Sequence, residues 1–344
     1  MADDLQMDDK WFVTKNYLKY NYKLCVSLSK MFSMHVLVTG ATGFIGSHLC
    51  QDLLNKGFKV TGICRKPRSI GTEHLHNSKE LHMKYCNIAN EDDLMNFFGI
   101  IGSVDGVIHM AGQPYRNDSP GIQTYFRNNL MGTINVLECC RAFNIKKFIF
   151  ASSYAVYGLG VGQYNPTHLP VDESHIVKPY DFYDASKFHA EQICRLYYER
   201  FGIESSILRY AKVYGPGLEE GVVYNVIQKA LQNLPIELNG DIGIDFLFVS
   251  DAAKATLKAL ERVSGFQIFN IGGGHASTLY SLCSKIIDLT KSRSQIKYSN
   301  KLSGHLSLDI SKARSFLDYH PTKLEDGLLT CINFIRNKKT LYQL

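Results

Sequence analysis

The chain has 344 residues, of which 45% are hydrophobic and 20% charged, a composition typical of a globular protein with a large buried core. Its formal net charge is +6, which is compatible with anionic ligands. No run of five Lys or Arg residues occurs, so the sequence does not indicate a nucleic-acid-binding patch. The absence of a long apolar stretch argues against a membrane span, and nine cysteines without a Cys-x-x-Cys pair predict reduced thiols in a cytoplasmic protein, with no metal site.

The predicted elements begin at residue 34. Residues 1–33 lack a hydrophobic signal region, and we predict that they form a disordered or loosely packed N-terminal extension. Strands are predicted at 35–40, 59–65, 106–112, 146–153 and 204–211, and helices at 46–57, 128–144 and 185–201. Strands that alternate with helices predict a doubly wound, parallel α/β sheet, which we assign to residues 34–211.

The alternation loosens after residue 211. We predict that residues 212–344 mainly form a smaller, discontinuous C-terminal domain. Residues 245–274 are expected to return to the parallel sheet, because "FQIFNIGGG" (266–274) has the pattern of a buried strand.

A glycine-rich turn joins the first predicted strand to the first helix. In "VTGATGFIGSHL" (38–49), Gly40, Gly43 and Gly46 are three residues apart. Glycine permits a tight turn and a close approach of the backbone to a pyrophosphate, which then lies at the helix N-terminus. The position of the turn in a strand–helix series therefore predicts a dinucleotide-binding site, although the glycines could also serve packing alone.

A tyrosine and a lysine are four residues apart in "YDASK" (183–187). Four helical residues give about 6 Å of rise and about 40° of rotation, so Tyr183 and Lys187 share one helix face. This arrangement suits a lysine that prepares a tyrosine for proton transfer. The same spacing also occurs by chance, so it does not decide the matter alone.

Further motifs carry a resemblance to a known superfamily. They are "GATGFIG" (40–46), "HMAG" (109–112), "SSYAVYG" (152–158), "YDASK" (183–187), "LRYAKVYGPG" (208–217), "DFLFVSDAA" (245–253) and "FNIGGG" (269–274). With these motifs in this order, the chain resembles the nucleotide-sugar epimerase/dehydratase group of the extended short-chain dehydrogenase/reductase superfamily. The resemblance implies a Rossmann-type fold, a C-terminal domain that binds substrate, and a cytoplasmic homodimer that binds a nucleotide-sugar but neither nucleic acid nor membrane.

The resemblance also implies roles for individual residues. The expected catalytic residues are Ser153, Tyr183 and Lys187. Besides the last two, the expected cofactor-binding residues are Gly40, Thr42, Gly43, Phe44, Ile45, Gly46, Arg65, Asn87, Ile88, Met110, Ala111 and Asn129. The expected substrate-binding residues are Gln113, Ser153, Lys212 and Asn225.

The chemistry of the implied trio is consistent with proton transfer. A free tyrosine has a pKa of about 10, too high for a base near neutrality. The ammonium of Lys187 and an oxidised nicotinamide would both favour the phenolate of Tyr183. The Ser153 hydroxyl can bridge a substrate hydroxyl and the phenol oxygen.

The cofactor-binding pattern departs from the family at the second strand. A carboxylate that binds the ribose of NAD usually ends this strand, but Cys64, Arg65 and Lys66 stand here, and Asn87 replaces a common aspartate. Cations suit the 2′-phosphate of NADP, so NAD or NADP is expected with NADP slightly favoured. A solvated basic loop is the alternative.

The substrate-binding pattern departs as well. Lys212 replaces an asparagine, Ile244 replaces an arginine, and "KLSGH" (301–305) replaces an arginine-containing segment, although Lys212 and Lys301 could compensate. Lys212 is expected to bind a substrate phosphate or carboxylate. Alternatively, it is a structural lysine paired with a nearby carboxylate such as Glu219 or Glu220.

Three functions remain open from the sequence. Tyr154 and Ala155 stand where 4,6-dehydratases carry an acidic pair, so dehydration is disfavoured. The leading prediction is an NAD(P)-dependent epimerase of a nucleotide-activated sugar that works through a keto intermediate. The alternatives are an NADPH-dependent keto-sugar reductase and, less favoured, a non-catalytic dinucleotide- or RNA-binding relative.

Overall fold

The computed structural model describes residues 34–65, 79–115, 121–158, 166–298 and 303–341. The predicted N-terminal extension lies outside these residues. Lys66 of the basic cluster after the second strand and Lys301, expected to compensate for a missing arginine, also lie outside them. Within the described part, no helix is both long enough and apolar enough to cross a membrane.

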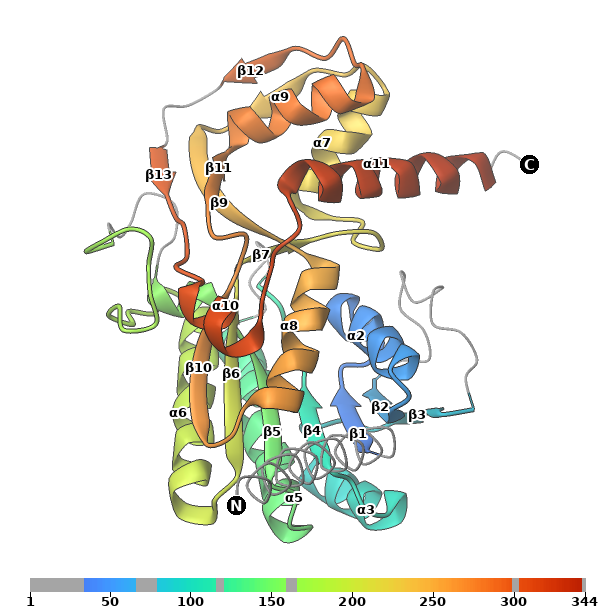
Figure 1. Ribbon diagram of the computed structural model, residues 1–344, viewed down its shortest axis with the longest axis vertical. Helices are drawn as coiled ribbons and strands as arrows, with labels where there is room; N and C mark the ends of the chain where they lie inside the picture. Colours follow the sequence, from blue (N-terminus) through green and yellow to red (C-terminus); the bar gives the residue numbers. More distant parts are fainter. Residues whose placement is uncertain (1–33, 66–78, 116–120, 159–165, 299–302, 342–344) are drawn as a thin grey trace, which may run out of the picture.

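A seven-stranded parallel sheet forms the larger layer of the molecule (Figure 1). Its strand order is β10-β6-β5-β4-β1-β2-β3, and each neighbouring pair is parallel. The strands are β1 (His35–Thr39), β2 (Lys59–Cys64), β3 (Leu81–Tyr85), β4 (Gly106–His109), β5 (Lys147–Ser153), β6 (Glu204–Tyr210) and β10 (Phe266–Ile271). The order reverses between β1 and β4, as in doubly wound sheets, so the predicted fold class is confirmed.

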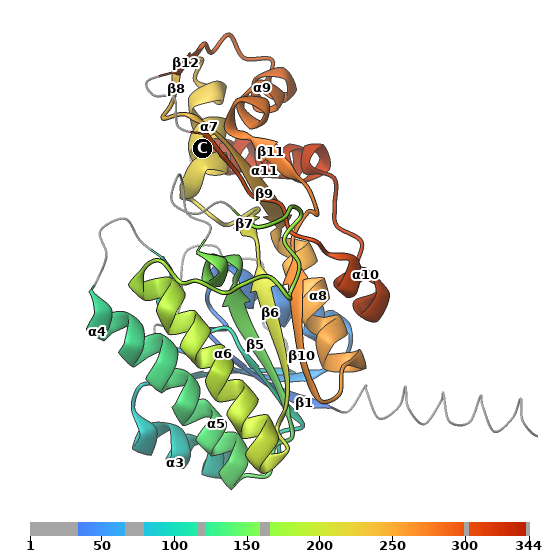
Figure 2. The same ribbon diagram turned by 90° about the vertical axis from the view of Figure 1, so that its left-hand side faces the viewer.

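Helices cover both faces of this sheet (Figure 2). One face carries α2 (Phe44–Asn55) and α8 (Val249–Arg262), and the other carries α3 (Glu91–Ile101), α5 (Gly132–Ala142) and α6 (Phe182–Phe201). Each face has its own hydrophobic core: Leu49 and Leu257 belong to the first, and Leu94 and Val136 to the second. Burial from both sides explains why β1 and β4 are fully buried and rich in apolar residues.

The chain between β4 and β5 departs from the single predicted helix at 128–144. It forms α4 (Ile122–Tyr125), a π-helical segment η1 (Phe126–Met131) and then α5. After β5 follows the 3₁₀ segment η2 (Tyr154–Tyr157). Helix α6 begins three residues earlier than predicted, because the Asp181 carboxylate caps it by accepting from the amide of Asp184 at 2.9 Å. Tyr183 therefore lies in the first turn of α6.

The smaller part of the molecule is built around short strands and three helices. Strands β11 (Ala276–Thr278), β9 (Asp241–Phe248), β13 (Ser303–His305) and β7 (Lys212–Tyr214) form one sheet, while β8 (Ile236–Leu238) pairs with β12 (Ile296–Tyr298). Helices α7 (Gly221–Leu231), α9 (Leu279–Thr290) and α11 (Leu324–Leu341) share a third hydrophobic core. The short α10 (Ser311–Leu317) packs back on α8 and β10.

The segment 245–274, expected to return to the large sheet, divides among three environments. Its first residues, 245–248, belong to β9 in the small sheet, and 249–262 form α8. Only β10 pairs with β6 at the edge of the large sheet. The division follows from burial, since α8 is needed to cover the face of the large sheet that α2 leaves open.

Candidate active site

The glycine turn between β1 and α2 is shaped by backbone contacts. Gly40 has φ +69°, and a Cβ on it would lie 2.8 Å from the amide nitrogen of Ala111. A Cβ on Gly46 would lie 2.2 Å from the carbonyl oxygen of Gly40, so no side chain fits there. Gly43 is the N-cap of α2 and has no side chain to cover the first amides of the helix. This turn fits a dinucleotide pyrophosphate at the helix N-terminus.

The other expected cofactor residues follow the carboxyl ends of neighbouring strands. Thr39 at the end of β1 is in register with Ile63 in β2 and with His109 in β4. Next to the β1–α2 junction, the expected residues are Arg65 after β2, Asn87 and Ile88 after β3, and Met110 and Ala111 after β4. The fold thus brings them to one edge of the sheet, where doubly wound proteins bind ligands.

Their environments differ along this edge. Arg65 and Asn87 are exposed, whereas Ile88 is buried, packs against Gly132 and accepts a hydrogen bond on its carbonyl from Asn135 at 2.9 Å. The Asn87 side-chain oxygen accepts from the amide of Ala89 at 3.2 Å. Ile88 therefore has a clear packing role in addition to the expected cofactor contact.

Asn129 connects three segments of the site. Its Oδ1 accepts from the amide of Gln113 at 2.6 Å, and its Nδ2 donates to the Gln113 carbonyl at 3.2 Å. The same Nδ2 donates to Ser186 Oγ at 2.9 Å, and Ser186 in turn donates to the Tyr183 carbonyl at 2.7 Å. Asn129 lies in the π-helical segment η1, a feature often found at functional sites. Its amide thus fixes the loop after β4 against the first turn of α6.

Lys187 is a buried ammonium held at the end of β5. Its Nζ donates to the Ala151 carbonyl at 2.8 Å and lies 5.0 Å from the centre of the Phe150 ring. Burial lowers the pKa of Lys187 to about 8, and the charge of Glu191 acts in the opposite direction. A buried lysine whose pKa is lowered in this way is a candidate functional residue.

Tyr183 faces Ser153 at the end of β5. Burial raises the pKa of the Tyr183 phenol above its usual value of about 10, and a hydrogen bond with the Ser153 side chain lowers it. Ser153 Oγ also accepts from the amide of Ala155 at 3.2 Å. In the protein alone, burial raises the pKa of Tyr183 by more than the Ser153 hydrogen bond lowers it. The phenolate that the sequence predicts therefore depends on the positive charge of a bound, oxidised nicotinamide ring.

Two tyrosine rings flank Tyr183. Tyr125 is buried, with ring centroids 5.9 Å apart, and Tyr115 is exposed, with ring centroids 6.3 Å apart. Both contacts are edge-to-face. The sequence analysis assigned neither residue, because an isolated tyrosine outside a motif gives no signal.

The expected substrate residues come from three elements. Gln113 is half-buried in the loop after β4, Lys212 is exposed in β7, and Asn225 is exposed on α7. In the described residues, Lys212 forms no ion pair with a carboxylate, and Glu219 pairs instead with Lys338. Burial by the surrounding protein lowers the pKa of Lys212, while the charge of Glu220 acts in the opposite direction. The structure therefore does not favour the structural pairing with Glu219.

A buried histidine also supports the site, although the sequence analysis gave it no role. Thr133 Oγ1 donates to the Asn129 carbonyl, so it accepts from Nε2 of His109 at 3.1 Å. The Nδ1 of His109 then accepts from Thr39 Oγ1 at 2.7 Å. Burial, followed by the Lys187 charge, lowers the pKa of His109 to about 3 and keeps the ring neutral. The motif "HMAG" could have signalled this residue.

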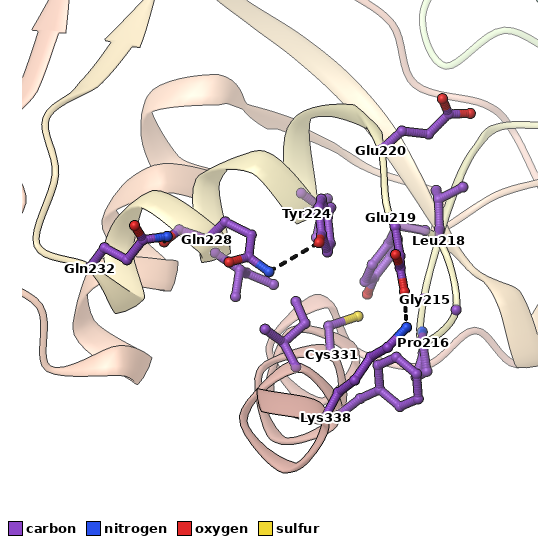
Figure 3. A pocket seen from close by; sticks show the side chains of 16 residues that line it. Gly215, Pro216, Leu218, Glu219, Glu220, Tyr224, Gln228, Gln232, Cys331 and Lys338 are labelled. Carbon is purple, nitrogen blue, oxygen red and sulfur yellow. Dashed lines mark hydrogen bonds and ion pairs between the residues drawn. The ribbon is translucent and has the colours of Figure 1, made fainter. Parts of the chain in front are cut away.

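A cavity of about 560 Å³ lies away from these groups, between the 215–220 loop, α7 and α11 (Figure 3). Tyr224, Cys331 and the Glu219–Lys338 ion pair contribute to its lining, whereas Ser153, Tyr183 and Lys187 do not. The side chains that can perform chemistry, and not this cavity, therefore locate the candidate active site. Among the described residues, no cluster of His, Cys, Asp and Glu is suited to hold a metal ion.

Comparison with known proteins gives the same family. The model of the "NAD dependent epimerase/dehydratase family" matches residues 36–272, which include the glycine turn and the Ser153–Tyr183–Lys187 group. The chain belongs to this family. The resemblance stated from the motifs is thereby confirmed.

Relatives of this epimerase/dehydratase chain cover nearly its whole length. A putative UDP-glucose 4-epimerase of Methanocaldococcus jannaschii is 35% identical, over 88% of this chain and 98% of the relative. The crystal structure of UDP-glucuronic acid 4-epimerase from Bacillus cereus with UDP-glucuronic acid and NAD is 31% identical with a TM-score of 0.77, over 89% of this chain and 100% of that chain. A UDP-N-acetylglucosamine 4-epimerase from Methanobrevibacter ruminantium, in complex with UDP-N-acetylmuramic acid, is 27% identical with a TM-score of 0.80, over 89% of this chain and 99% of that chain.

Proposed function

We propose that this protein is an NAD(P)-dependent epimerase that inverts C4 of a UDP-activated sugar. The observation that carries the proposal is the meeting of Ser153, Tyr183 and Lys187 beside the glycine turn at one edge of the sheet. The names of the relatives support the UDP-sugar and the C4 position, and the NAD in the related complex supports the cofactor. The relatives are epimerases, which favours isomerisation over net reduction of a keto-sugar.

The residues would divide the chemistry as follows. Tyr183 takes the proton of the C4 hydroxyl as the C4 hydrogen leaves with its electron pair, and it returns that proton when hydride reaches the opposite face of the keto sugar. Ser153 bridges the sugar oxygen and the phenol, and Lys187 stabilises the phenolate by its charge. The bound nicotinamide supplies the hydride acceptor and donor. The glycine turn, Met110, Ala111 and the other expected residues at this edge would hold the dinucleotide.

The function is tested by incubating the purified protein with UDP-glucose, UDP-glucuronic acid and UDP-N-acetylglucosamine, without added reductant. Chromatographic separation of the C4 epimers should show conversion of at least one substrate to an equilibrium mixture, with no net change in reduced cofactor. A keto-sugar reductase would leave these substrates unchanged and would instead consume one NADPH for each molecule of a UDP-keto-sugar that it reduces in a parallel incubation with added NADPH. A bound dinucleotide without any conversion would identify a non-catalytic relative.

Cofactor choice rests on the end of β2. The NAD of the related complex supports NAD, whereas the exposed Arg65 after the neutral Cys64 keeps NADP as the finer prediction. We expect Arg65→Ala to weaken NADP binding by about ten-fold, because it removes a charged hydrogen bond to the 2′-phosphate, and to leave NAD binding nearly unchanged. Calorimetric titration with both dinucleotides measures this. Tighter binding of NAD by the unaltered protein, or equal weakening of both, would contradict the NADP preference.

Lys212 is proposed as a ligand of the substrate phosphate or carboxylate. Lys212 is an exposed residue, and within the described part of the chain no ion pair with a carboxylate holds its ammonium. We expect Lys212→Asn to raise the substrate KM by about ten-fold, because a charged hydrogen bond is lost, and to leave dinucleotide affinity unchanged. Lys229→Asn on α7 serves as the matched control. An unaltered KM together with a lower melting temperature would show that Lys212 is structural.

The assembly and location are inferred from the family alone. We propose a cytoplasmic homodimer that binds neither nucleic acid nor membrane. The exposed apolar side chains Leu196 and Phe201 on α6 are compatible with a partner subunit on this helix.

A further inference from the structure

Tyr115 stands beside Tyr183 without a part in the chemistry proposed above. Its side chain is 56% exposed, although large aromatic side chains are usually covered. Its ring meets the ring of Tyr183 edge-to-face at an interplanar angle of 70°. The second neighbour of the Tyr183 ring, Tyr125, is only 2% exposed. Tyr115 is therefore the flanking ring that a ligand can reach.

The position of Tyr115 relative to Tyr183 is fixed through the backbone. Two residues before Tyr115, both the amide and the carbonyl of Gln113 are bonded to the Asn129 side chain. The same side chain is bonded to Ser186, which holds the Tyr183 carbonyl. The buried Asn129 amide thus ties the segment that carries Tyr115 to the helix turn that carries Tyr183.

We propose that Tyr115 is a specificity-determining residue that forms an aromatic wall of the sugar subsite. This inference rests on the proposed function, since Tyr183 is taken to be the residue that meets the C4 hydroxyl. A hexose ring has an apolar C–H face, which an exposed aromatic ring can cover while polar groups bind the hydroxyls. The ligand of Tyr115 is accordingly the C–H face of the UDP-linked hexose.

The wall would act on the sugar and not on the nucleotide. The keto sugar has to expose its second face while it stays linked to UDP and close to Tyr183. A rigid apolar wall suits this step because it holds the ring by contact area without fixing the direction of any hydroxyl. Lys212, the proposed ligand of a substrate phosphate or carboxylate, lies on a different element, β7.

The test compares binding of UDP-glucose with binding of UDP by calorimetry, in a Tyr183→Phe background that prevents turnover and with dinucleotide present. Tyr115→Ala should weaken UDP-glucose binding about five-fold, the size of one lost aromatic contact, and leave UDP binding within two-fold. Tyr115→Phe should bind both like the parent, because the ring is retained. Tyr280→Ala, an exposed tyrosine on α9 in the small part of the molecule, is the matched control.

Any other outcome would contradict the proposed role of Tyr115. Unchanged UDP-glucose binding in Tyr115→Ala would show that the ring does not contact the sugar, and equal weakening of UDP and UDP-glucose binding would indicate a structural effect. Weakening by Tyr115→Phe as large as that by Tyr115→Ala would assign the contact to the hydroxyl and not to the ring. If the unaltered protein neither bound nor converted any UDP-sugar, the proposed function itself would fail.

Discussion

Tyr183→Phe is expected to lower kcat by about 10²–10⁴-fold, the contribution typical of general acid–base catalysis. The substitution removes only the phenolic oxygen. The ring stays between Tyr115 and Tyr125, and the Ser186 bond to the residue-183 carbonyl does not depend on the side chain. Dinucleotide affinity and the melting temperature should therefore remain close to those of the unaltered protein.

The measurement is the initial rate of C4 epimerisation, with dinucleotide binding followed by calorimetry on the same samples. Tyr198→Phe is the matched control, because it makes the same change on the same helix at a tyrosine that packs against Phe266. It should retain the full rate. A Tyr183→Phe variant with more than a tenth of the wild-type rate would remove Tyr183 from its proposed role.

The strands of the large sheet were predictable where burial is two-sided. Helices cover both faces of β1, β5 and β6, whose residues are nearly all buried, and the predicted bounds of these strands agree with the structure within one residue. β3 was missed because its sequence, "LHMKY", has no buried residue and forms the edge strand of the sheet. The three-residue strands β7, β8, β11, β12 and β13 are too short for a period-two pattern to be recognised.

The candidate site was predictable only where a motif names its residues. The motifs gave Ser153, Tyr183 and Lys187, and parallel strands with short connections explain why residues distant in sequence meet at one edge. The sequence could not reveal that the Asn129 amide binds the Gln113 backbone, because such a contact depends on the π-helical turn. Tyr115 likewise became notable only through its ring contact with Tyr183.

A buried ion pair behind the site was also hidden from the sequence. Glu191 lies one turn after Lys187 on α6, and Arg209 lies on β6. The side chains are 0% and 3% exposed, and Arg209 donates to both carboxylate oxygens of Glu191, at 3.0 and 2.7 Å. Ser152 donates to the same carboxylate at 2.5 Å. Each charge, read alone in the sequence, looks like an ordinary surface residue.

Glu191→Gln is expected to destabilise the fold by about 3–5 kcal/mol, because it leaves the buried guanidinium of Arg209 without its counter-charge. For a chain of this size, that loss should lower the melting temperature by roughly 4–7 °C. Activity should fall as well, since Ser152 precedes Ser153 and the Glu191 charge raises the pKa of Lys187. Thermal unfolding followed by circular dichroism measures the effect, and Glu199→Gln, an exposed carboxylate on the same helix, should change little.

The double variant Glu191→Leu/Arg209→Met separates an ion-pair effect from a packing effect. If the loss in Glu191→Gln comes from an uncompensated buried charge, removing both charges should restore part of the stability, since apolar replacements of buried pairs are often neutral or stabilising. The double variant is therefore expected to melt above Glu191→Gln. Melting below the single variant would mean that the bond donated by Ser152 to Glu191 and the bond donated by Arg209 to Tyr157, and not the charge balance of the pair, hold β5 and β6 against α6.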